Sequence, residues 1–463
     1  MIDAFHLPAL RDPPTTVWSF GKGDDAVELR VPRLTPEMLR AQVTELVEMR
    51  ERHLARRSVA EVVEVVDRVA ARLLDSGDEL RAAAERALPA VTGYSAPMIR
   101  RVLDRMAADW RAEPLFDLLR ADLGDPGVLD GFRPNPVGRG LRAAFGPRLA
   151  AHVFSGNVPG VAVTSIVRSL LVKAATLGKT AAGEPLLAAL FARGIAEEDA
   201  GLGRCLAVTY WPGGDEEMER AAQERADAVI VYGGADAVAA VRSRTPPGAR
   251  FLGYGSRLSF GVVGRGWLDG ERAAEAARAA ALDASTFDQQ GCVSPHLFYV
   301  EEGGKVDPRE WARLLAAEME AVERELPRGA LAPGESSAIR QLRAEAEFAE
   351  GTELHASAEG TAWTVVFDPD PAFTASCLNR VVRVKPVPSL TDVAALVESY
   401  ASVLQTVGLS AAEDEGRELA AALGRLGASR VAPLGRMAWP PPHWHHDGRP
   451  PLGDLVRWCD LEE

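Results

Sequence analysis

One cysteine lies in a short polar turn whose residue types could do chemistry. The segment at residues 287–296 reads FDQQGCVSPH, so Cys292 follows a glycine and precedes a Ser-Pro pair. A thiolate is a soft nucleophile that attacks carbonyl carbons, and such a turn can present the sulfur to a substrate. A single cysteine is also a common packing residue. These ten residues alone leave both interpretations open.

A second loop could place an amide beside a reacting carbonyl. The segment at 155–160 reads SGNVPG, which offers the side-chain amide of Asn157 just before a predicted helix. A side-chain amide can stabilise the negative oxygen that forms when a nucleophile adds to a carbonyl. Asparagine, glycine and proline are also ordinary turn residues. By spacing alone, a plain turn is the commoner interpretation.

Glycines follow several predicted strands and could bring phosphate groups close to the backbone. VYGG (231–234) and GYGS (253–256) end two strands, and LGKT (177–180) adds the ammonium of Lys179 and the hydroxyl of Thr180. A dinucleotide binds at the carboxyl ends of parallel strands, where backbone N–H groups meet the pyrophosphate. No GxGxxG motif follows a strand, and one glycine at a strand end is usually only a turn. The three strand ends together favour a phosphate site more than any one does.

The histidines are weaker candidates. His443, His445 and His446 cluster in the proline-rich segment HWHHDGRPP, but no cysteine pair lies near them, so we expect no bound metal. His296 follows the cysteine turn at the start of a predicted strand, and we interpret it as structural. The sequence therefore shows no evident histidine base for Cys292.

Strands and helices alternate in the part of the chain that carries these motifs. Residues 1–145 have mainly helical spacing, as in Arg56 to Asp75, and a Pro- and Gly-rich linker follows at 124–146. We predict strands at 171–178, 205–211, 226–234, 250–263, 296–302, 361–368 and 379–387. We predict further helices at 215–225, 235–242, 271–283 and 391–407. Strand–helix–strand units at this spacing predict a doubly wound α/β sheet.

Length, charge and composition exclude several classes of protein. The 463 residues are too many for one ordinary core, so we expect two or three domains. A net charge of −14 argues against nucleic acid as a partner. Arg168 and Lys173 interrupt the apolar stretch at 158–177, so we expect no membrane span. No signal sequence opens the chain, and the other cysteines, Cys205, Cys377 and Cys459, form no pair. We therefore expect a cytoplasmic protein with reduced thiols.

Five segments, taken in order, resemble the aldehyde dehydrogenase superfamily. They are SGNVPG (155–160), LGKTAAGEP (177–185), ADAVIVYGGADAV (226–238), RFLGYGSRLSFGVVG (250–264) and FDQQGCVSP (287–295). Three more are similar to the acyl-CoA reductases typified by the reductase of bacterial luminescence: VTGYSAPMI (91–99), GPRLAAHVFSGNVPG (146–160) and DGRPPLGDLVRW (447–458). The resemblance covers roughly residues 85–460 and implies that family's fold and chemistry.

The implied fold has two Rossmann-like α/β domains and a small oligomerisation element. Residues 1–145 would form a mainly helical part of the cofactor domain, and 146–265 would bind a nicotinamide dinucleotide. Residues 266–435 would form the catalytic domain, and the tail at 436–463 would serve oligomerisation or bridging. Members of the superfamily are usually dimers or tetramers, so the resemblance implies a homodimer or homotetramer.

The resemblance also assigns roles to individual residues. Cys292 matches the nucleophile, and Asn157 matches the asparagine that helps bind the oxyanion. Lys179 matches the lysine near the adenosine ribose, with Thr180 beside it. The remaining implied cofactor contacts are Ser155, Gly156, Tyr232, Gly233, Gly234, Gly253, Tyr254 and Gly255.

Departures from the superfamily pattern sharpen the expected activity. Gly253 stands where aldehyde-oxidising members carry a glutamate that activates water, so the acyl-enzyme should not be hydrolysed. Ala182 stands where NAD-preferring members carry a carboxylate, which favours NADPH over NADH. Gln289 replaces the usual glycine three residues before the nucleophile, and no clear match to the ribose-binding glutamate lies near Ser376 to Asn379.

The expected reaction is the NADPH-dependent reduction of an acyl thioester, from acyl-CoA or an acyl carrier protein, to an aldehyde. Cys292 would hold the acyl group, and the thioester would accept hydride and collapse through a thiohemiacetal. Three alternatives remain open: an acylating or oxidising aldehyde dehydrogenase, a cysteine acyltransferase without redox chemistry, and a non-catalytic partner protein.

Overall fold

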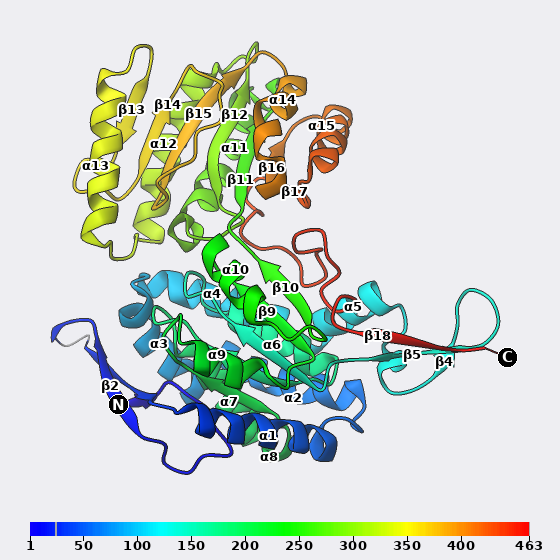
Figure 1. Cartoon of the computed structure of the whole chain (residues 1–463). Helices are drawn as coiled ribbons and strands as arrows, with labels where there is room; N and C mark the ends of the chain where they lie inside the picture. The colour runs from blue at the N-terminus through cyan, green and yellow to red at the C-terminus, as the bar shows by residue number, and fades with distance from the viewer. Residues whose placement is uncertain (24–25, 463) are drawn as a thin grey trace.

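The computed structural model describes residues 1–23 and 26–462, which form two α/β lobes linked by the end of the chain (Figure 1). The lower lobe in Figure 1 holds a five-stranded sheet and the N-terminal helices, and the upper lobe holds a seven-stranded sheet. A small three-stranded sheet projects from the lower lobe as an arm. The predicted α/β class with parallel sheets and a helical N-terminal region is confirmed.

The N-terminal region is built of five helices behind a small sheet. The helices are α1 (Pro36–His53), α2 (Val59–Leu74), α3 (Glu79–Thr92), α4 (Ala96–Asp109) and α5 (Ala112–Leu123). The strands are β1 (Ile2–Asp3), β2 (Thr15–Phe20) and β3 (Val27–Pro32). Helix α2 begins with a capping box between Ser58 and Glu61 and buries valines at helical spacing, including Val62, Val66 and Val69. These helices give the lower lobe its core.

The five-stranded sheet has the order β10-β9-β6-β7-β8, and every neighbouring pair is parallel. Its strands are β6 (Leu149–Val153), β7 (Ala175–Lys179), β8 (Leu206–Thr209), β9 (Ala228–Tyr232) and β10 (Arg250–Tyr254). Its connecting helices are α6 (Val161–Leu171), α7 (Leu187–Glu198), α8 (Ala200–Gly203), α9 (Glu216–Gln223) and α10 (Ala235–Arg244). Strand order reverses at β6, and ligands of such sheets bind at the carboxyl ends beside the reversal. The loop with Asn157 leaves the sheet at that point.

The seven-stranded sheet has the order β13-β14-β15-β12-β11-β16-β17, with only β13 antiparallel to its neighbour. Its strands are β11 (Leu258–Val263), β12 (Pro295–Glu301), β13 (Glu353–Ala356), β14 (Thr364–Phe367), β15 (Val381–Val387), β16 (Leu404–Ser410) and β17 (Arg430–Pro433). Its longer helices are α11 (Gly270–Ser285), α12 (Pro308–Glu325), α13 (Pro333–Phe348) and α15 (Glu413–Leu426). Cys292 lies between α11 and β12, at the edge that faces the lower lobe.

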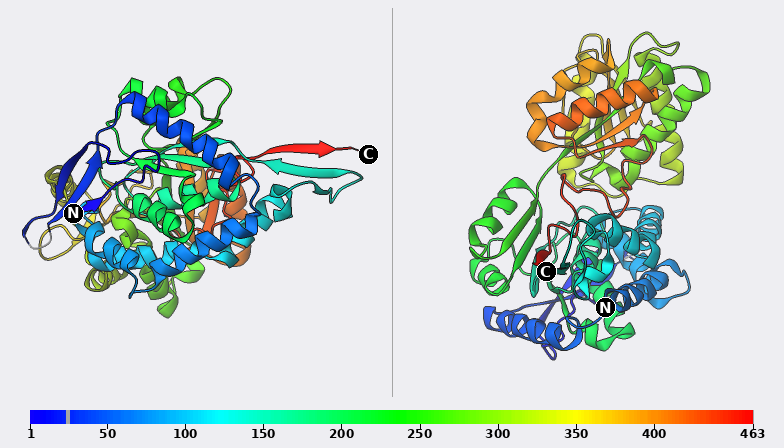
Figure 2. Two further views of the ribbon diagram at one scale, coloured as in Figure 1. Left: turned by 90° about the horizontal axis from the view of Figure 1, so that it is seen from below. Right: turned by 90° about the vertical axis from the view of Figure 1, so that its right-hand side faces the viewer.

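The arm brings together two distant parts of the chain. Its strands are β4 (Arg133–Pro134), β5 (Leu141–Phe145) and β18 (Arg457–Leu461), in the antiparallel order β18-β5-β4. In the left view of Figure 2 the arm extends well away from the body. It exposes several large apolar side chains: Phe132, Val137, Phe145, Trp458 and Leu461.

The segment at 435–456, here called the C-terminal strap, crosses between the lobes (Figure 1). On the upper lobe, the buried carboxylate of Asp283 accepts from the N–H of Gly435 (2.6 Å) and Met437 (3.0 Å). On the lower lobe, Arg168 donates to the carbonyl of Pro442 (3.3 Å) and Asp122 accepts from the N–H of Leu452 (2.6 Å). The strap is therefore fixed to both lobes.

Two expectations about secondary structure were wrong. The predicted strand at 250–263 is two strands in two sheets, because the chain passes from β10 to β11 and so from one lobe to the other. The predicted helix at 391–407 is three short helical turns, at 390–392, 393–397 and 398–403, followed by the buried strand β16. Burial between β11 and β17 decides the conformation of β16, and local periodicity does not report it. Within the described residues, no helix combines the length and apolar character that crossing a bilayer requires.

Candidate active site

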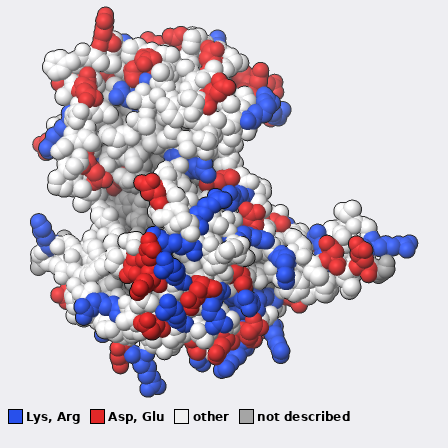
Figure 3. Space-filling model, viewed as in Figure 1, with Lys and Arg blue, Asp and Glu red and all other residues white. Residues whose placement is uncertain are grey.

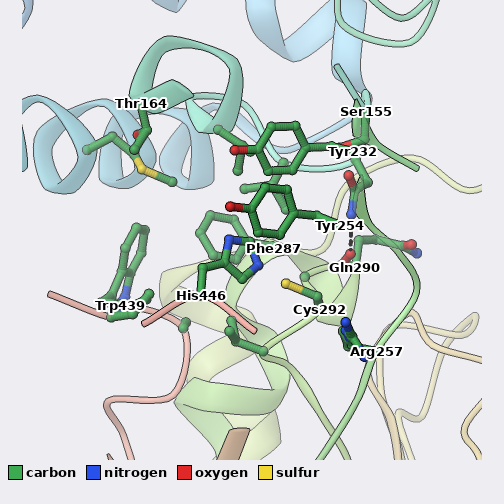
Figure 4. A pocket seen from close by; sticks show the side chains of 18 of the residues that line it. Ser155, Thr164, Tyr232, Tyr254, Arg257, Phe287, Gln290, Cys292, Trp439 and His446 are labelled. Atoms are coloured by element: carbon green, nitrogen blue, oxygen red, sulfur yellow. Dashed lines mark hydrogen bonds between the residues drawn. The ribbon is translucent and has the colours of Figure 1, made fainter. Parts of the chain in front are cut away.

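Cys292 faces a cavity of about 580 Å³ between the two lobes (Figure 4). Figure 3 shows the molecule hollowed between the lobes on one face, with mostly uncharged walls. The predicted residues that line the cavity are Ser155, Gly156, Asn157, Tyr232, Gly233, Gly234, Tyr254, Gly255 and Cys292. Its remaining wall comes mainly from α4, α5, α6 and the C-terminal strap, including Met106, Trp110, Leu115, Leu118, Val161, Val167, Trp439 and Trp444.

The turn before the nucleophile is strained. After α11 ends at Ser285, three consecutive residues take left-handed backbone angles: Phe287 (φ 56°), Asp288 (φ 48°) and Gln289 (φ 65°). Left-handed angles cost a residue with a side chain roughly 1–2 kcal/mol each. Such strain persists only where surrounding contacts hold it. The position of Gln289 explains why a glycine is usual there in the superfamily.

A second left-handed turn supplies those contacts. Leu378, Asn379 and Arg380 have φ values of 65°, 58° and 65°. The guanidinium of Arg380, which is fully buried, contacts the carboxylate of Asp288 at 2.6 Å and that of Glu323 at 2.7 Å. A buried ion pair of this kind resists separation because either partner alone would be an unpaired buried charge. The two turns therefore hold each other in place.

The hydroxyl of Tyr94 joins the loop of Asn157 to the nucleophile turn. It lies 2.6 Å from the carbonyl oxygen of Asn157 and 3.0 Å from that of Phe287. The side-chain amide of Asn157 in turn donates to the carbonyl of Gln290 at 2.7 Å. An amide nitrogen carries two hydrogens, so the second remains available to an oxyanion at Cys292. Asn157 and Cys292 thus line the same cavity, and Tyr94, which was not among the predicted residues, joins their two segments.

Burial, with the nearby charge of Asp447, raises the pKa of the Cys292 thiol to about 11, although the amide of Gln405 and the charge of Arg257 oppose the shift. The thiolate is the attacking species, so this cysteine must lose its proton when substrate binds. The other thiols are Cys205, which is buried, and Cys377 and Cys459, which do not line this cavity.

The strap brings an acid–histidine pair beside the nucleophile. Asp447 receives two bonds from Arg257, from Nη2 at 2.7 Å and Nε at 3.0 Å, and one from Gln405 Nε2 at 2.8 Å. The ring of His446 stacks on Tyr254 with 4.5 Å between centroids, and its Nε2 lies 4.0 Å from Asp447. His446 lines the cavity, whereas His443 and His445 are exposed. In the part of the chain that the structure describes, no three metal-ligating side chains gather as a metal would need.

His296, which the sequence suggested to be structural, bonds to the backbone of a neighbouring segment. Its Nδ1 accepts from the backbone N–H of Ser376 at 3.1 Å, and burial lowers its pKa to about 4. It therefore ties the segment before the second left-handed turn to β12. This agrees with the structural interpretation of His296 from the sequence.

The strand ends of the lower lobe offer groups that fit a dinucleotide. The ammonium of Lys179 lies over the rings of Tyr210 (5.9 Å) and Trp211 (5.8 Å), and the Lys179 side chain is paired with no carboxylate among the described residues. Gly234 opens α10, and neither Gly234 nor Gly255 has an atom near the place of a Cβ. A free cation and open backbone at neighbouring strand ends suit an anionic ligand.

Three predicted cofactor residues lie differently from the expectation. The hydroxyl of Thr180 is buried and donates to the carbonyl of Thr209 at 3.2 Å, so it faces no ligand. Tyr232 lines the Cys292 cavity, stacks on Tyr254 with 4.8 Å between ring centroids, and donates its hydroxyl hydrogen to Ser165. A Cβ at position 253 would approach Phe251 and Val238, so Gly253 faces α10 and does not line the cavity. Side-chain direction on a strand alternates, and the sequence motif does not reveal it.

Comparison with known proteins agrees with this geometry. Residues 54–458 match the family of acyl-CoA reductases called LuxC. The long-chain acyl-protein thioester reductase of Aliivibrio fischeri is 28% identical over 81% of this chain and 77% of its own length. Aldehyde dehydrogenase 21 from Physcomitrella patens has a similar fold, with a TM-score of 0.75 and 14% identity over 97% of this chain and 95% of its own. An indole-3-acetaldehyde dehydrogenase solved with NAD⁺ also has a TM-score of 0.75, at 14% identity over 96% and 93% of the two chains.

The family match covers most of the chain, and the similarity to the solved structures extends over nearly the whole of both chains. The fold is therefore that of the aldehyde dehydrogenases, as the sequence resemblance implied. Reduction of an acyl thioester on this fold implies a nicotinamide cofactor. The chain belongs to the acyl-CoA reductase (LuxC) family and is an oxidoreductase that reduces acyl thioesters.

Proposed function

We propose that this protein reduces a long-chain acyl thioester to the aldehyde with NADPH, through an acyl group held on Cys292. The observation that carries the proposal is the meeting of Cys292 and Asn157 at one end of a largely apolar cavity. Cys292 attacks the thioester carbonyl, and the donor thiol leaves. The side-chain amide of Asn157 and the N–H of Cys292 stabilise the oxyanion that forms each time a group adds to the carbonyl.

The cavity is suited to an apolar acyl chain. Its volume of about 580 Å³ falls within the roughly 300–1,000 Å³ typical of ligand pockets. Apolar side chains of α4, α5 and α6 form the wall that leads away from Cys292. The relatives named as long-chain acyl-protein thioester reductases support a long acyl chain carried on a protein thiol. Acyl-CoA remains the simplest soluble donor on which to test the site.

NADPH, when bound, supplies the hydride that reduces the acyl group. Lys179 would hold a phosphate of the adenosine end, and the backbone at Gly233 and Gly234 would approach the pyrophosphate. Ala182, exposed beside Lys179, places no carboxylate against a 2′-phosphate. This side chain set favours NADPH over NADH because the 2′-phosphate gains a cation and meets no anion.

Reduction is favoured over hydrolysis because few carboxyl groups near Cys292 could activate water. Among the described residues, Asp109 on α4 is the only carboxyl group that lines the cavity. Asp447 is closer to Cys292 but is engaged by Arg257 and Gln405. An acyl-enzyme whose nearest carboxylate is already engaged in hydrogen bonds survives long enough to accept hydride. Collapse of the thiohemiacetal then releases the aldehyde and the Cys292 thiolate.

We expect the arm to mediate self-association. Phe145 and Trp458 face solvent on β5 and β18, and exposed apolar side chains on a projecting sheet suit burial against a second copy. A homodimer or homotetramer is the assembly expected from the fold. Light scattering coupled to size-exclusion chromatography measures the assembly directly.

The proposed activity is tested by adding acyl-CoAs of increasing chain length and following the loss of NADPH absorbance at about 340 nm. Activity should require Cys292 and should be abolished by Cys292→Ala, whereas Cys377→Ala, at a partly buried thiol outside the cavity, should remain active. A Cys292→Ala enzyme that still turns over would overturn the role of this cysteine.

A further inference from the structure

Three groups that line the cavity, among the described residues, have chemistry that could remove the proton from Cys292: His446, His296 and Asp109. The thiol is protonated at neutral pH because burial and the charge of Asp447 raise its pKa to about 11. Attack on a thioester therefore needs a proton acceptor within the site. His296 is occupied by the N–H of Ser376, and Asp109 lies on α4 away from the nucleophile turn.

The side chains around Cys292 link it to His446 through a short contiguous cluster. Gln405 contacts the Cys292 thiol and donates to Asp447 Oδ1 at 2.8 Å. The same Oδ1 lies 4.0 Å from Nε2 of His446. Figure 4 shows the imidazole of His446 and the sulfur of Cys292 facing the same space. The imidazole is therefore a neighbour of the reacting thiol and not a distant tail residue.

The imidazole is neutral and held in a fixed orientation. Burial lowers the pKa of His446 to about 4, so the ring is free to accept a proton at neutral pH. The ring stacks between Tyr254 and Trp444, with centroids 4.5 Å and 4.8 Å away. Asp447, itself fixed by Arg257, lies 4.0 Å from Nε2 of the ring. The charged or titratable groups that face the ring are Asp447, Arg257, Arg168, Tyr232, Tyr254 and Cys292.

We propose that His446 relays a proton from the Cys292 thiol to the departing donor thiol, with Asp447 as its positioning residue. This rests on the proposed reduction of an acyl thioester and adds the group that makes its first half possible. As the Cys292 sulfur bonds to the carbonyl carbon, its S–H bond breaks and a ring nitrogen of His446 takes the proton. The carbon–sulfur bond to the donor then breaks, and the departing sulfur receives that proton. The products are the acyl-enzyme and a free thiol, with no change in oxidation state.

The relay explains how a thiol that resists ionisation can still react. The proton moves while the new carbon–sulfur bond forms, so neither a free thiolate nor a lasting imidazolium has to accumulate. In the second half-reaction, collapse of the thiohemiacetal expels the Cys292 thiolate. That thiolate takes one proton from solvent, which is the proton that the overall reduction consumes.

The test uses His446→Phe, which keeps the aromatic stack and removes both ring nitrogens. Its exposed neighbour provides the matched control, His445→Phe, which should behave as wild type. Acylation of Cys292 is followed by intact mass with two thioesters of one acyl group, one with an alkyl thiol and one with a more acidic aryl thiol. General acid–base catalysis typically contributes 10²- to 10⁴-fold, so acylation by the alkyl thioester should slow about 100-fold or more.

The loss should be smaller with the aryl thioester, because an acidic thiol leaves without a proton. Once acylated, the variant should be reduced by NADPH at the wild-type rate. An equal loss with both thioesters, or a loss confined to the hydride step, would overturn the relay. If His446→Phe unfolds, as judged by circular dichroism, His446→Gln is measured in its place under the same criteria. Absence of any acyl adduct on wild-type Cys292 would instead contradict the proposed function itself, so the two failures are distinguishable.

Discussion

The side chain of Gln289 pairs with the backbone of Val381 as one strand pairs with its neighbour. Its Nε2 donates to the carbonyl of Val381 at 2.9 Å, and its Oε1 accepts from the N–H of Val381 at 2.9 Å. The same Nε2 also donates to the carbonyl of Pro295 at 2.7 Å. The residue that replaces the superfamily's usual glycine therefore offsets its backbone strain with three buried hydrogen bonds.

Removing the Gln289 amide should lower the free energy of unfolding. The decrease should be smaller when the replacing residue adopts a left-handed backbone without strain. Gln289→Ala leaves buried polar groups unpaired at roughly 1–3 kcal/mol each and keeps the left-handed strain. Gln289→Gly loses the same bonds but relieves strain of about 1–2 kcal/mol. Urea denaturation should therefore rank wild type above Gln289→Gly, and Gln289→Gly above Gln289→Ala by about 1 kcal/mol. Equal midpoints for the two variants would show that the φ of 65° carries no cost.

Loss of the Tyr94 hydroxyl should slow acylation of Cys292 strongly and lower the free energy of unfolding only slightly. Tyr94→Phe removes the link between Asn157 and Phe287, so the oxyanion donor is free to drift from Cys292. Small misplacements of catalytic groups cost up to about 100-fold, and we expect at least a tenfold slower formation of the acyl-enzyme. The free energy of unfolding should fall by only about 1 kcal/mol.

A matched control for Tyr94→Phe exists on β12. Tyr299 is fully buried, and its hydroxyl has no hydrogen-bond partner among the described residues. Tyr299→Phe should therefore leave the rate of acylation unchanged. If Tyr94→Phe is acylated as fast as Tyr299→Phe, the result would contradict a positioning role for Tyr94.

The raised pKa of Cys292 predicts the pH dependence of its alkylation. Because the folded-state pKa of about 11 lies above the ordinary thiol value, the thiolate fraction at any lower pH is reduced. The rate of reaction with iodoacetamide should rise roughly tenfold per pH unit from pH 7 to 9.5, without a plateau near pH 8.5. Peptide mass spectrometry measures Cys292 and the exposed Cys459 in the same samples. A plateau for Cys292 near pH 8 would contradict the burial argument.

Cofactor preference should follow the charges around Lys179. Ala182→Glu places a carboxylate beside the position proposed for a 2′-phosphate and should weaken NADPH binding at least tenfold, with NADH less affected. Lys179→Met removes the cation and should weaken NADPH more than NADH. Titration of tryptophan fluorescence measures both affinities without turnover. Equal effects on the two cofactors would place the 2′-phosphate elsewhere.

The sequence predicted site residues that stand in local motifs, and it did not predict site residues that the C-terminal strap contributes from far along the chain. Cys292, Asn157 and Lys179 each stand in a motif beside a strand end, and the resemblance of those motifs to the superfamily implied their roles. His446 and Asp447 reach the site only because Asp283, Arg168 and Arg257 anchor the strap across both lobes. Nothing in the proline-rich segment HWHHDGRPP indicates those anchors, and only the inward-facing histidine of the three is near Cys292.

The sequence also could not predict which side chains of a strand face the cavity. The motif around Gly253 identifies a strand end, but only the fold shows that Tyr254 faces the cavity and Gly253 faces α10. Tyr94 was predicted to lie in a family segment but carried no chemical signal, because a tyrosine after a helix is usually a packing residue. Its role depends on two carbonyls that lie 63 and 193 residues farther along the chain.

The most direct test of the central claim is the intact mass of the protein after incubation with an acyl-CoA in the absence of NADPH. Wild type should gain the mass of one acyl group, placed on Cys292 by peptide mapping. Addition of NADPH should remove that mass and release the matching aldehyde. The adduct should persist in the Cys205→Ala, Cys377→Ala and Cys459→Ala variants and be absent from Cys292→Ala. An adduct that forms on Cys292→Ala, or one on wild type that NADPH does not discharge, would contradict reduction through this cysteine.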